Sequence, residues 1–164
     1  MKYIFIDAEY AFTCSSREGQ HPNYKNILEA LNREKDESVK LVYHVGNAGK
    51  KRGVSDFLTK SGVDYNIILE FELASKTQLV GAQMGIDVMR YCQTSTDATF
   101  TFLTGDDYLI PIIAELLKYD VKIEVFYFPA IFSHELSQVL DRERIKAERM
   151  STRYFTFPRI KNGN

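Results

Sequence analysis

Three aspartates have the residue type and the setting for phosphodiester chemistry. Asp7 ends the apolar run of residues 2–6, and Asp106 follows the apolar run of residues 98–103 after a Thr-Gly pair. Asp87 lies at the predicted start of a helix. Carboxylates that are buried together repel one another unless a cation neutralises them. Mg²⁺ and Mn²⁺ take oxygen ligands, so these acids predict a metal site that assists hydrolysis.

Each aspartate also has an ordinary structural role open to it. Asp7 could cap a turn, and Asp87 and Asp106 could each cap a helix or lie in its first turn. We favour function for Asp7 and Asp106 because acids at strand ends of an α/β sheet lie where ligands bind. For Asp87 alone the two interpretations are balanced. Glu9 and Asp107 offer spare carboxylates beside the first and third acids.

The rest of the chain alternates short β-rich runs with helical stretches, a pattern typical of a mostly parallel sheet with helices on both faces. The sequence therefore predicts a three-layer α/β/α, Rossmann-like domain. Predicted strands span residues 2–6, 40–45, 63–69, 98–103 and 121–128. Predicted helices span residues 23–34, 54–61, 86–93 and 108–119, with a short final helix from Ser133. Residues 14–22 are expected to be a loop, and residues 71–83 have no clear assignment.

The composition fits one domain with a proper core, since 164 residues are 45% apolar and 26% charged. No apolar run reaches the roughly 18–20 residues that span a bilayer. The N-terminus runs straight into a predicted strand, unlike a signal peptide. We therefore expect a cytoplasmic protein without a membrane segment. Cys14 and Cys92 have no metal-ligand spacing and are expected to be reduced thiols.

Basic residues gather toward the C-terminus. Residues 142–164 carry seven Lys or Arg and two Glu, a balance of about +5, whereas the whole chain has a net charge of −1. We predict a domain over residues 1–145 and a basic tail over residues 146–164. Arg149 and Arg153 in this tail are candidate phosphate contacts, although a solvated extension fits the charge equally well.

A second basic segment, residues 46–53, is Gly- and Lys-rich. Lys50, Lys51 and Arg52 could contact a nucleic-acid backbone or simply be solvated. The segment lacks the Gly-Lys-Ser/Thr ending of a P-loop, which argues against nucleotide hydrolysis.

The segments around Asp7, Asp87 and Asp106 form three sequence motifs. Residues 6–10 read Ile-Asp-Ala-Glu-Tyr, residues 85–88 read Gly-Ile-Asp-Val, and residues 103–109 read Leu-Thr-Gly-Asp-Asp-Tyr-Leu. These segments resemble three motifs of the NYN domain family, also called LabA-like, which belongs to the PIN-like ribonuclease superfamily. In the same order, the motifs are the Ile-Asp-Gly-x-Asn opening, the Gly-Val-Asp-Val helix start and the sequence Ser-Gly-Asp-Ser-Asp-Phe-x-Pro-Leu. Including the strand and helix that follow, the resemblance covers residue 2 to about 142.

The resemblance implies a PIN-like fold and a Mg²⁺- or Mn²⁺-dependent ribonuclease that acts on single-stranded or structured RNA. Asp7, Asp87 and Asp106 would be the catalytic acids and metal ligands, with Glu9 or Asp107 as an auxiliary acid. The basic residues named above (Lys50, Lys51, Arg52, Arg149 and Arg153) would contact RNA.

Two positions depart from the family pattern. Tyr108 stands where the second aspartate of the third motif would fall, and Asp107 comes one residue early, a rotation of ~100° on a helix. Tyr10 stands where the opening motif has asparagine. These departures favour an alternative, a regulator with weakened catalysis that binds RNA or a protein. A haloacid-dehalogenase-type phosphatase, with Lys76 as its lysine, is a minor alternative. The sequence is also compatible with a homo-oligomer.

Overall fold

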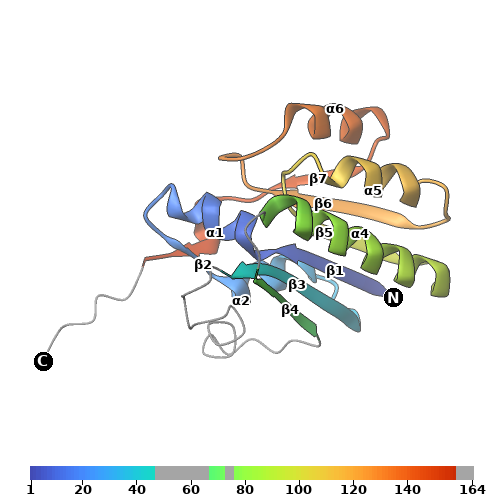
Figure 1. The fold of residues 1–164 in the computed structure, drawn as a ribbon, viewed down its shortest axis with the longest axis horizontal. Coiled ribbons are helices and arrows are strands. Elements are labelled where there is room, and N and C mark those ends of the chain that lie inside the picture. Colours follow the sequence, from blue (N-terminus) through green and yellow to red (C-terminus); the bar gives the residue numbers. More distant parts are fainter. Residues whose placement is uncertain (47–66, 73–75, 158–164) are drawn as a thin grey trace, which may run out of the picture.

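The central feature is a six-stranded sheet with strand order β4-β3-β1-β5-β6-β7, in which every neighbouring pair is parallel. The structure, a computed structural model, describes the backbone of residues 1–46, 67–72 and 76–157 and the side chains of residues 1–43 and 79–157. Helices cover both faces of this sheet (Figure 1). The predicted α/β class, with a sheet between two helix layers, is confirmed. The predicted helix 54–61 and the basic residues Lys50, Lys51 and Arg52 lie outside the described residues.

The elements have the following bounds. The strands of the main sheet are β1 (Lys2–Asp7), β3 (Ser38–Gly46), β4 (Ile67–Glu72), β5 (Thr99–Leu103), β6 (Lys122–Tyr127) and β7 (Lys146–Arg149). The helices are α1 (Ala8–Ser16), α2 (Tyr24–Leu31), α4 (Lys76–Thr94), α5 (Leu109–Leu116), α6 (His134–Arg142) and the 3₁₀ helix η1 (Thr152–Tyr154). Two short strands, β2 (His21–Pro22) and β8 (Phe155–Thr156), pair antiparallel in a second sheet.

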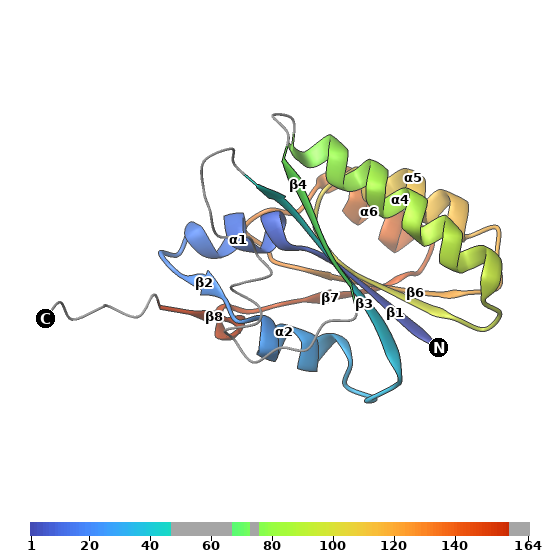
Figure 2. The ribbon, with the colours of Figure 1, turned by 60° about the horizontal axis from the view of Figure 1, so that its bottom comes forward.

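Successive side chains of β1 point to opposite faces of the sheet, so they belong to two separate parts of the core. Tyr3 and Phe5 belong to a cluster with residues of α4, α5 and α6. Ile4 and Ile6 belong to a second cluster with residues of α1, α2 and β8. Figure 2 shows α4, α5 and α6 together on one side of the sheet and α2 on the other. β1 is buried along its whole length, and its middle residues, Tyr3 to Ile6, form a continuous apolar run in the sequence.

The strand order places a switch point at the centre of the sheet. From β1 the chain first builds outward through β3 and β4, then returns to the other side of β1 with β5. Ligands of open parallel sheets bind outside the carboxyl ends of the strands at such a point. Asp7 ends β1, and Asp106 follows the end of β5 by three residues. The two acids therefore flank the switch point.

Two helices differ from the sequence prediction. Residues 8–16 form α1, a helix that the prediction missed. Its buried residues are mostly small (Ala8, Ala11, Cys14 and Ser15), so its apolar face gives little contrast in the sequence. The helix predicted from residue 86 begins at Lys76 instead, because α4 runs on through Gly81 and Gly85, two residues that weaken a helix prediction.

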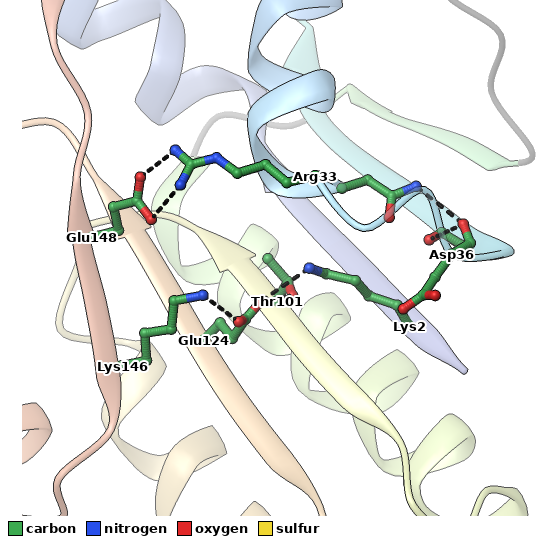
Figure 3. Close-up of polar contacts among 9 residues, drawn as sticks. Lys2, Arg33, Asp36, Thr101, Glu124, Lys146 and Glu148 are labelled. Carbon is green, nitrogen blue, oxygen red and sulfur yellow. Dashed lines mark hydrogen bonds and ion pairs between the residues drawn. The ribbon is translucent and has the colours of Figure 1, made fainter.

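The boundary predicted at residue 145 is also wrong as a limit of the fold. Lys146–Arg149 form edge strand β7, and Met150, Tyr154 and Phe155 are buried in the core. Ion pairs support this edge: the Lys146 and Lys2 ammonium groups donate to Glu124 at 2.6 and 3.0 Å (Figure 3). Arg33, two residues after the end of α2, donates from both terminal guanidinium nitrogens to the two carboxylate oxygens of Glu148 (Figure 3). Residues 146–157 are therefore part of the domain.

Among the described residues, no helix has both the length and the apolar character needed to cross a membrane.

Candidate active site

A cavity of about 190 Å³ lies at the carboxyl edge of the sheet, at the switch point. Acids and apolar or hydroxyl-bearing groups form its wall: Asp7, Glu9, Tyr10, Thr13, Val80, Asp106 and Ile131. Three carboxylates thus face one small space, and none of these lining residues is basic. Such a wall favours a cation or a ligand that brings one.

Asp7 is the most deeply buried acid of this wall, at 2% exposure. Its Oδ1 accepts a hydrogen bond from the Tyr10 backbone N–H at 2.9 Å, which caps the N-terminus of α1. Its Oδ2 accepts a hydrogen bond from the Tyr108 hydroxyl at 2.7 Å. Asp7 therefore has the structural role that the sequence left open, and it also lines the cavity.

Burial raises the pKa of Asp7 from 3.8 to about 7, although the two hydrogen bonds from Tyr10 and Tyr108 work in the opposite direction. The neighbouring charges of Asp106 and Glu9 raise it further. Burial also raises the pKa of Asp106, with a contribution from the charge of Asp107. A carboxylate with a raised pKa is stabilised in its ionised form when a cation binds beside it.

Asp87 does not lie on the cavity wall. It sits within α4, more than two turns after the start of the helix, and it is 3% exposed. Its Oδ2 accepts hydrogen bonds from the Tyr43 hydroxyl at 3.1 Å and from Gln83 Nε2 at 3.2 Å. Its Oδ1 forms an ion pair with Arg90 at 3.1 Å. The structure therefore places Asp87 in a separate, internally neutralised cluster.

Of the three aspartates, Asp7 and Asp106 line the cavity together and Asp87 does not. Across the described residues, no group of three or more His, Cys, Asp or Glu lies close enough to hold one metal ion. The expectation for Asp87 depended on a helix that begins at residue 86, whereas α4 begins at Lys76, so Asp87 lies about three turns into the helix. Glu9 takes the third place on the cavity wall instead. The side chain of Asp107 is exposed and does not line the cavity.

The two tyrosines at the departing positions have defined roles that sequence reasoning missed. The Tyr10 hydroxyl donates to the Ile131 carbonyl at 2.7 Å and accepts from the Phe128 N–H at 2.8 Å, so it ties α1 to the segment after β6. The Tyr108 hydroxyl holds Asp7 and also lies 3.2 Å from Thr104 Oγ1.

Each of these tyrosines has a glycine against it. A Cβ on Gly105 would lie 2.6 Å from the Tyr10 hydroxyl oxygen and closer still to the Ile131 carbonyl oxygen. A Cβ on Gly81 would lie 2.8 Å from Cγ of Tyr108. The glycines were visible in the sequence, but only the structure shows which side chain each one accommodates.

The described basic candidates do not reach the cavity wall. Arg149 is exposed at the end of β7, and Arg153 is exposed on η1. The guanidinium of Arg153 donates to the Tyr154 hydroxyl at 2.6 Å and lies 4.8 Å from the centre of its ring. Both residues are exposed enough to contact a ligand that extends beyond the cavity.

The sequence profile of the NYN domain matches residues 3–147, almost the entire described fold. The chain belongs to the NYN domain family. This membership indicates a PIN-like nuclease superfamily domain, as the motifs around the acids predicted, and it favours this class over a haloacid-dehalogenase phosphatase.

A solved structure of a protein of unknown function from Vibrio parahaemolyticus has the same fold as this NYN domain. The two share 14% identity with a TM-score of 0.66, over 94% of each chain. This likeness supports the fold alone. A search of curated proteins gave no match.

The donor set of the NYN domain's cavity fits a hard divalent cation bound by few protein ligands. Mg²⁺ commonly uses one or two carboxylates and completes its shell with water and substrate phosphate. Asp7 and Asp106, flanking the switch point, supply two carboxylates of this kind, with Glu9 on the same wall. The set does not fit a cage made of three aspartates, because Asp87 lies elsewhere.

Proposed function

We propose that this NYN domain is a metal-dependent ribonuclease that cleaves RNA phosphodiester bonds in the cavity between Asp7 and Asp106. The observation that carries the proposal is a cavity at the switch point of the sheet whose wall, among the residues that the structure describes, has three carboxylates and no basic residue. RNA is the expected substrate of the superfamily, and its phosphates bring the charge that a carboxylate-bound cation would neutralise.

Asp7 and Asp106 would hold Mg²⁺ or Mn²⁺, which supplies charge neutralisation at the scissile phosphate and lowers the pKa of a bound water. The chain's own groups orient this site. The Tyr10 N–H fixes Asp7 Oδ1 and the Tyr108 hydroxyl fixes Oδ2, so the carboxylate is held in one orientation. Glu9, which lies in the first turn of α1 and on the same cavity wall, would accept a proton from the attacking water.

A second candidate, an RNA- or protein-binding regulator without turnover, is favoured by the Tyr108 contact. Its hydroxyl already occupies Oδ2 of Asp7, and Asp87 is neutralised by Arg90. A regulator of this kind has no need to bind a divalent ion. Metal-dependent turnover therefore separates the two candidates.

The experiment is cleavage of a labelled mixed-sequence RNA in Mn²⁺, Mg²⁺ or EDTA by the wild type, Asp106→Asn and Asp87→Asn. We expect cleavage with either ion, none in EDTA, and loss of cleavage in Asp106→Asn alone. Asp87→Asn is the matched control because it removes the same charge outside the cavity. Absence of metal-dependent cleavage by the wild type would reject the nuclease in favour of the regulator.

A further inference from the structure

Two stacked rings lie at the surface beside the cavity. Phe12 of α1 is 46% exposed, and its ring stacks on His21 with centroids 5.9 Å apart and planes inclined by 17°. Residues three and four apart on a helix share a face. Phe12 and Thr13 follow Glu9 at these spacings, and both Glu9 and Thr13 line the cavity. One face of α1 therefore carries Glu9 and Thr13 of the cavity wall together with Phe12, and His21 of β2 stacks on Phe12.

The aromatic surface continues onto the neighbouring short strands. His21 of β2 is paired with Thr156 of β8, and the next residue, Phe157, is 74% exposed. Figures 1 and 2 both show α1, β2 and β8 gathered at the same end of the molecule. By contrast Tyr154 and Phe155, which the basic tail brings to the same region, are 8% exposed and belong to the core.

A cation borders the same region. Arg17 follows α1, is exposed, and donates from its guanidinium to the Ala130 carbonyl at 2.8 Å. Ala130 precedes Ile131, which lines the cavity. A positive group and flat exposed rings beside a phosphodiester site are the two components of surfaces that bind single-stranded nucleic acid.

We propose that Phe12 and His21 form a stacking platform for an unpaired base of RNA whose backbone continues into the Asp7–Asp106 cavity. The proposal rests on the nuclease function above and narrows its substrate to single-stranded RNA. A base in a duplex has both faces covered by its neighbours, whereas an unpaired base can be splayed onto an aromatic ring. Arg17 contacts the adjoining backbone.

The protein contains no tryptophan, which allows a direct test. Phe12→Trp places a single indole at the platform, and its fluorescence is quenched when a base stacks on it. Tyr119→Trp is the matched control. Tyr119 is also an exposed aromatic residue, at 38% exposure, but it lies between α5 and β6 at the amino edge of the sheet. Each variant is titrated in a buffer that contains Ca²⁺, first with an unstructured RNA oligonucleotide and then with the same strand paired in a duplex.

We expect quenching at position 12 by the single strand, little by the duplex, and none at position 119. Phe12→Ala should weaken single-strand binding about fivefold or more, the effect of one lost stacked base. Tyr119→Ala should leave binding unchanged. Absence of quenching at position 12, or equal quenching by the duplex, would overturn the platform.

Cleavage by the wild type in Mn²⁺ is scored separately, so the two proposals fail in different ways. Cleavage without quenching removes the platform and keeps the nuclease. Quenching of the single strand without cleavage supports the platform and removes the nuclease. Circular dichroism of each variant confirms that the fold is retained.

Discussion

Asp7 links the site to the stability of the fold through its buried carboxyl group. Its pKa is about 7 in the folded protein against an ordinary value of 3.8, because burial disfavours the charge. The folded state therefore binds this proton more tightly than the unfolded state. The contribution of Asp7 to the free energy of unfolding falls as the pH rises from about 4 to about 7 and is constant above that range.

Asp7→Asn tests this linkage. Asparagine keeps an oxygen acceptor for the Tyr10 N–H but carries no charge. In EDTA, we expect the variant to gain stability relative to the wild type as the pH rises from 4 to 8, by roughly 1–4 kcal/mol. Urea unfolding across this pH range measures the difference. A difference that is the same at every pH would show that Asp7 titrates normally.

Tyr108→Phe removes the hydroxyl that holds Asp7 Oδ2. Because this hydrogen bond lowers the pKa of Asp7, its loss should raise that pKa and move the pH dependence of Mn²⁺ binding to higher pH. Tyr43→Phe is the matched control, since it removes a buried hydroxyl from Asp87. A binding profile that shifts equally in both variants, or in neither, would contradict the role given to Tyr108.

The sequence was informative about Asp7 and Asp106 because both follow strong apolar runs, and parallel strands bring such ends to one edge. It could not identify the contact between Tyr108 and Asp7. That contact depends on side-chain direction at the start of α5 and on the space at Gly81, neither of which has a local sequence pattern. The prediction started the helix of Asp87 ten residues late, so it did not show that this residue lies inside α4.

At the scale of elements, the packing of α4 against the residue before α5 positions the site. Gly81→Ala would place a Cβ against the Tyr108 ring, so we expect a loss of ~1–3 kcal/mol in the free energy of unfolding. Gly85→Ala is the control in the same helix. Its Cβ would lie 3.7 Å from Ile112, an ordinary contact, so alanine should be neutral or stabilising by up to about 1 kcal/mol. Denaturant unfolding measures both, and equal effects would contradict the account.

The strands were largely predictable and the helices less so. Strands β1, β3, β5 and β6 appear in the sequence as apolar or aromatic runs because the sheet is buried on both faces. Helix α1 was missed because its packing depends on small residues and on the cap from Asp7. Strand β7 was missed because a short edge strand with two basic residues and one acidic residue has the same composition as a solvated tail.

At the scale of the whole molecule, the C-terminal segment completes the fold. A chain that ends after residue 145 loses β7 and three buried residues, Met150, Tyr154 and Phe155. Removing buried side chains of this size costs ~2–5 kcal/mol each, a large part of a typical total stability. We expect that chain to lose cooperative thermal unfolding, whereas a chain that ends after residue 157 keeps it. Calorimetry of the two chains measures the difference. Equal thermal unfolding transitions would show that residues 146–157 are a tail that does not contribute to the fold.

In the proposed function, Asp7 and Asp106, and not Asp87, hold the divalent ion of this NYN domain. Titration of Mn²⁺ followed by electron paramagnetic resonance tests it without any substrate, using the wild type, Asp7→Asn, Asp106→Asn and Asp87→Asn. We predict saturable binding by the wild type and Asp87→Asn, and its loss in the two cavity variants. Wild-type protein that leaves Mn²⁺ free in solution, or binding lost only in Asp87→Asn, would contradict the account.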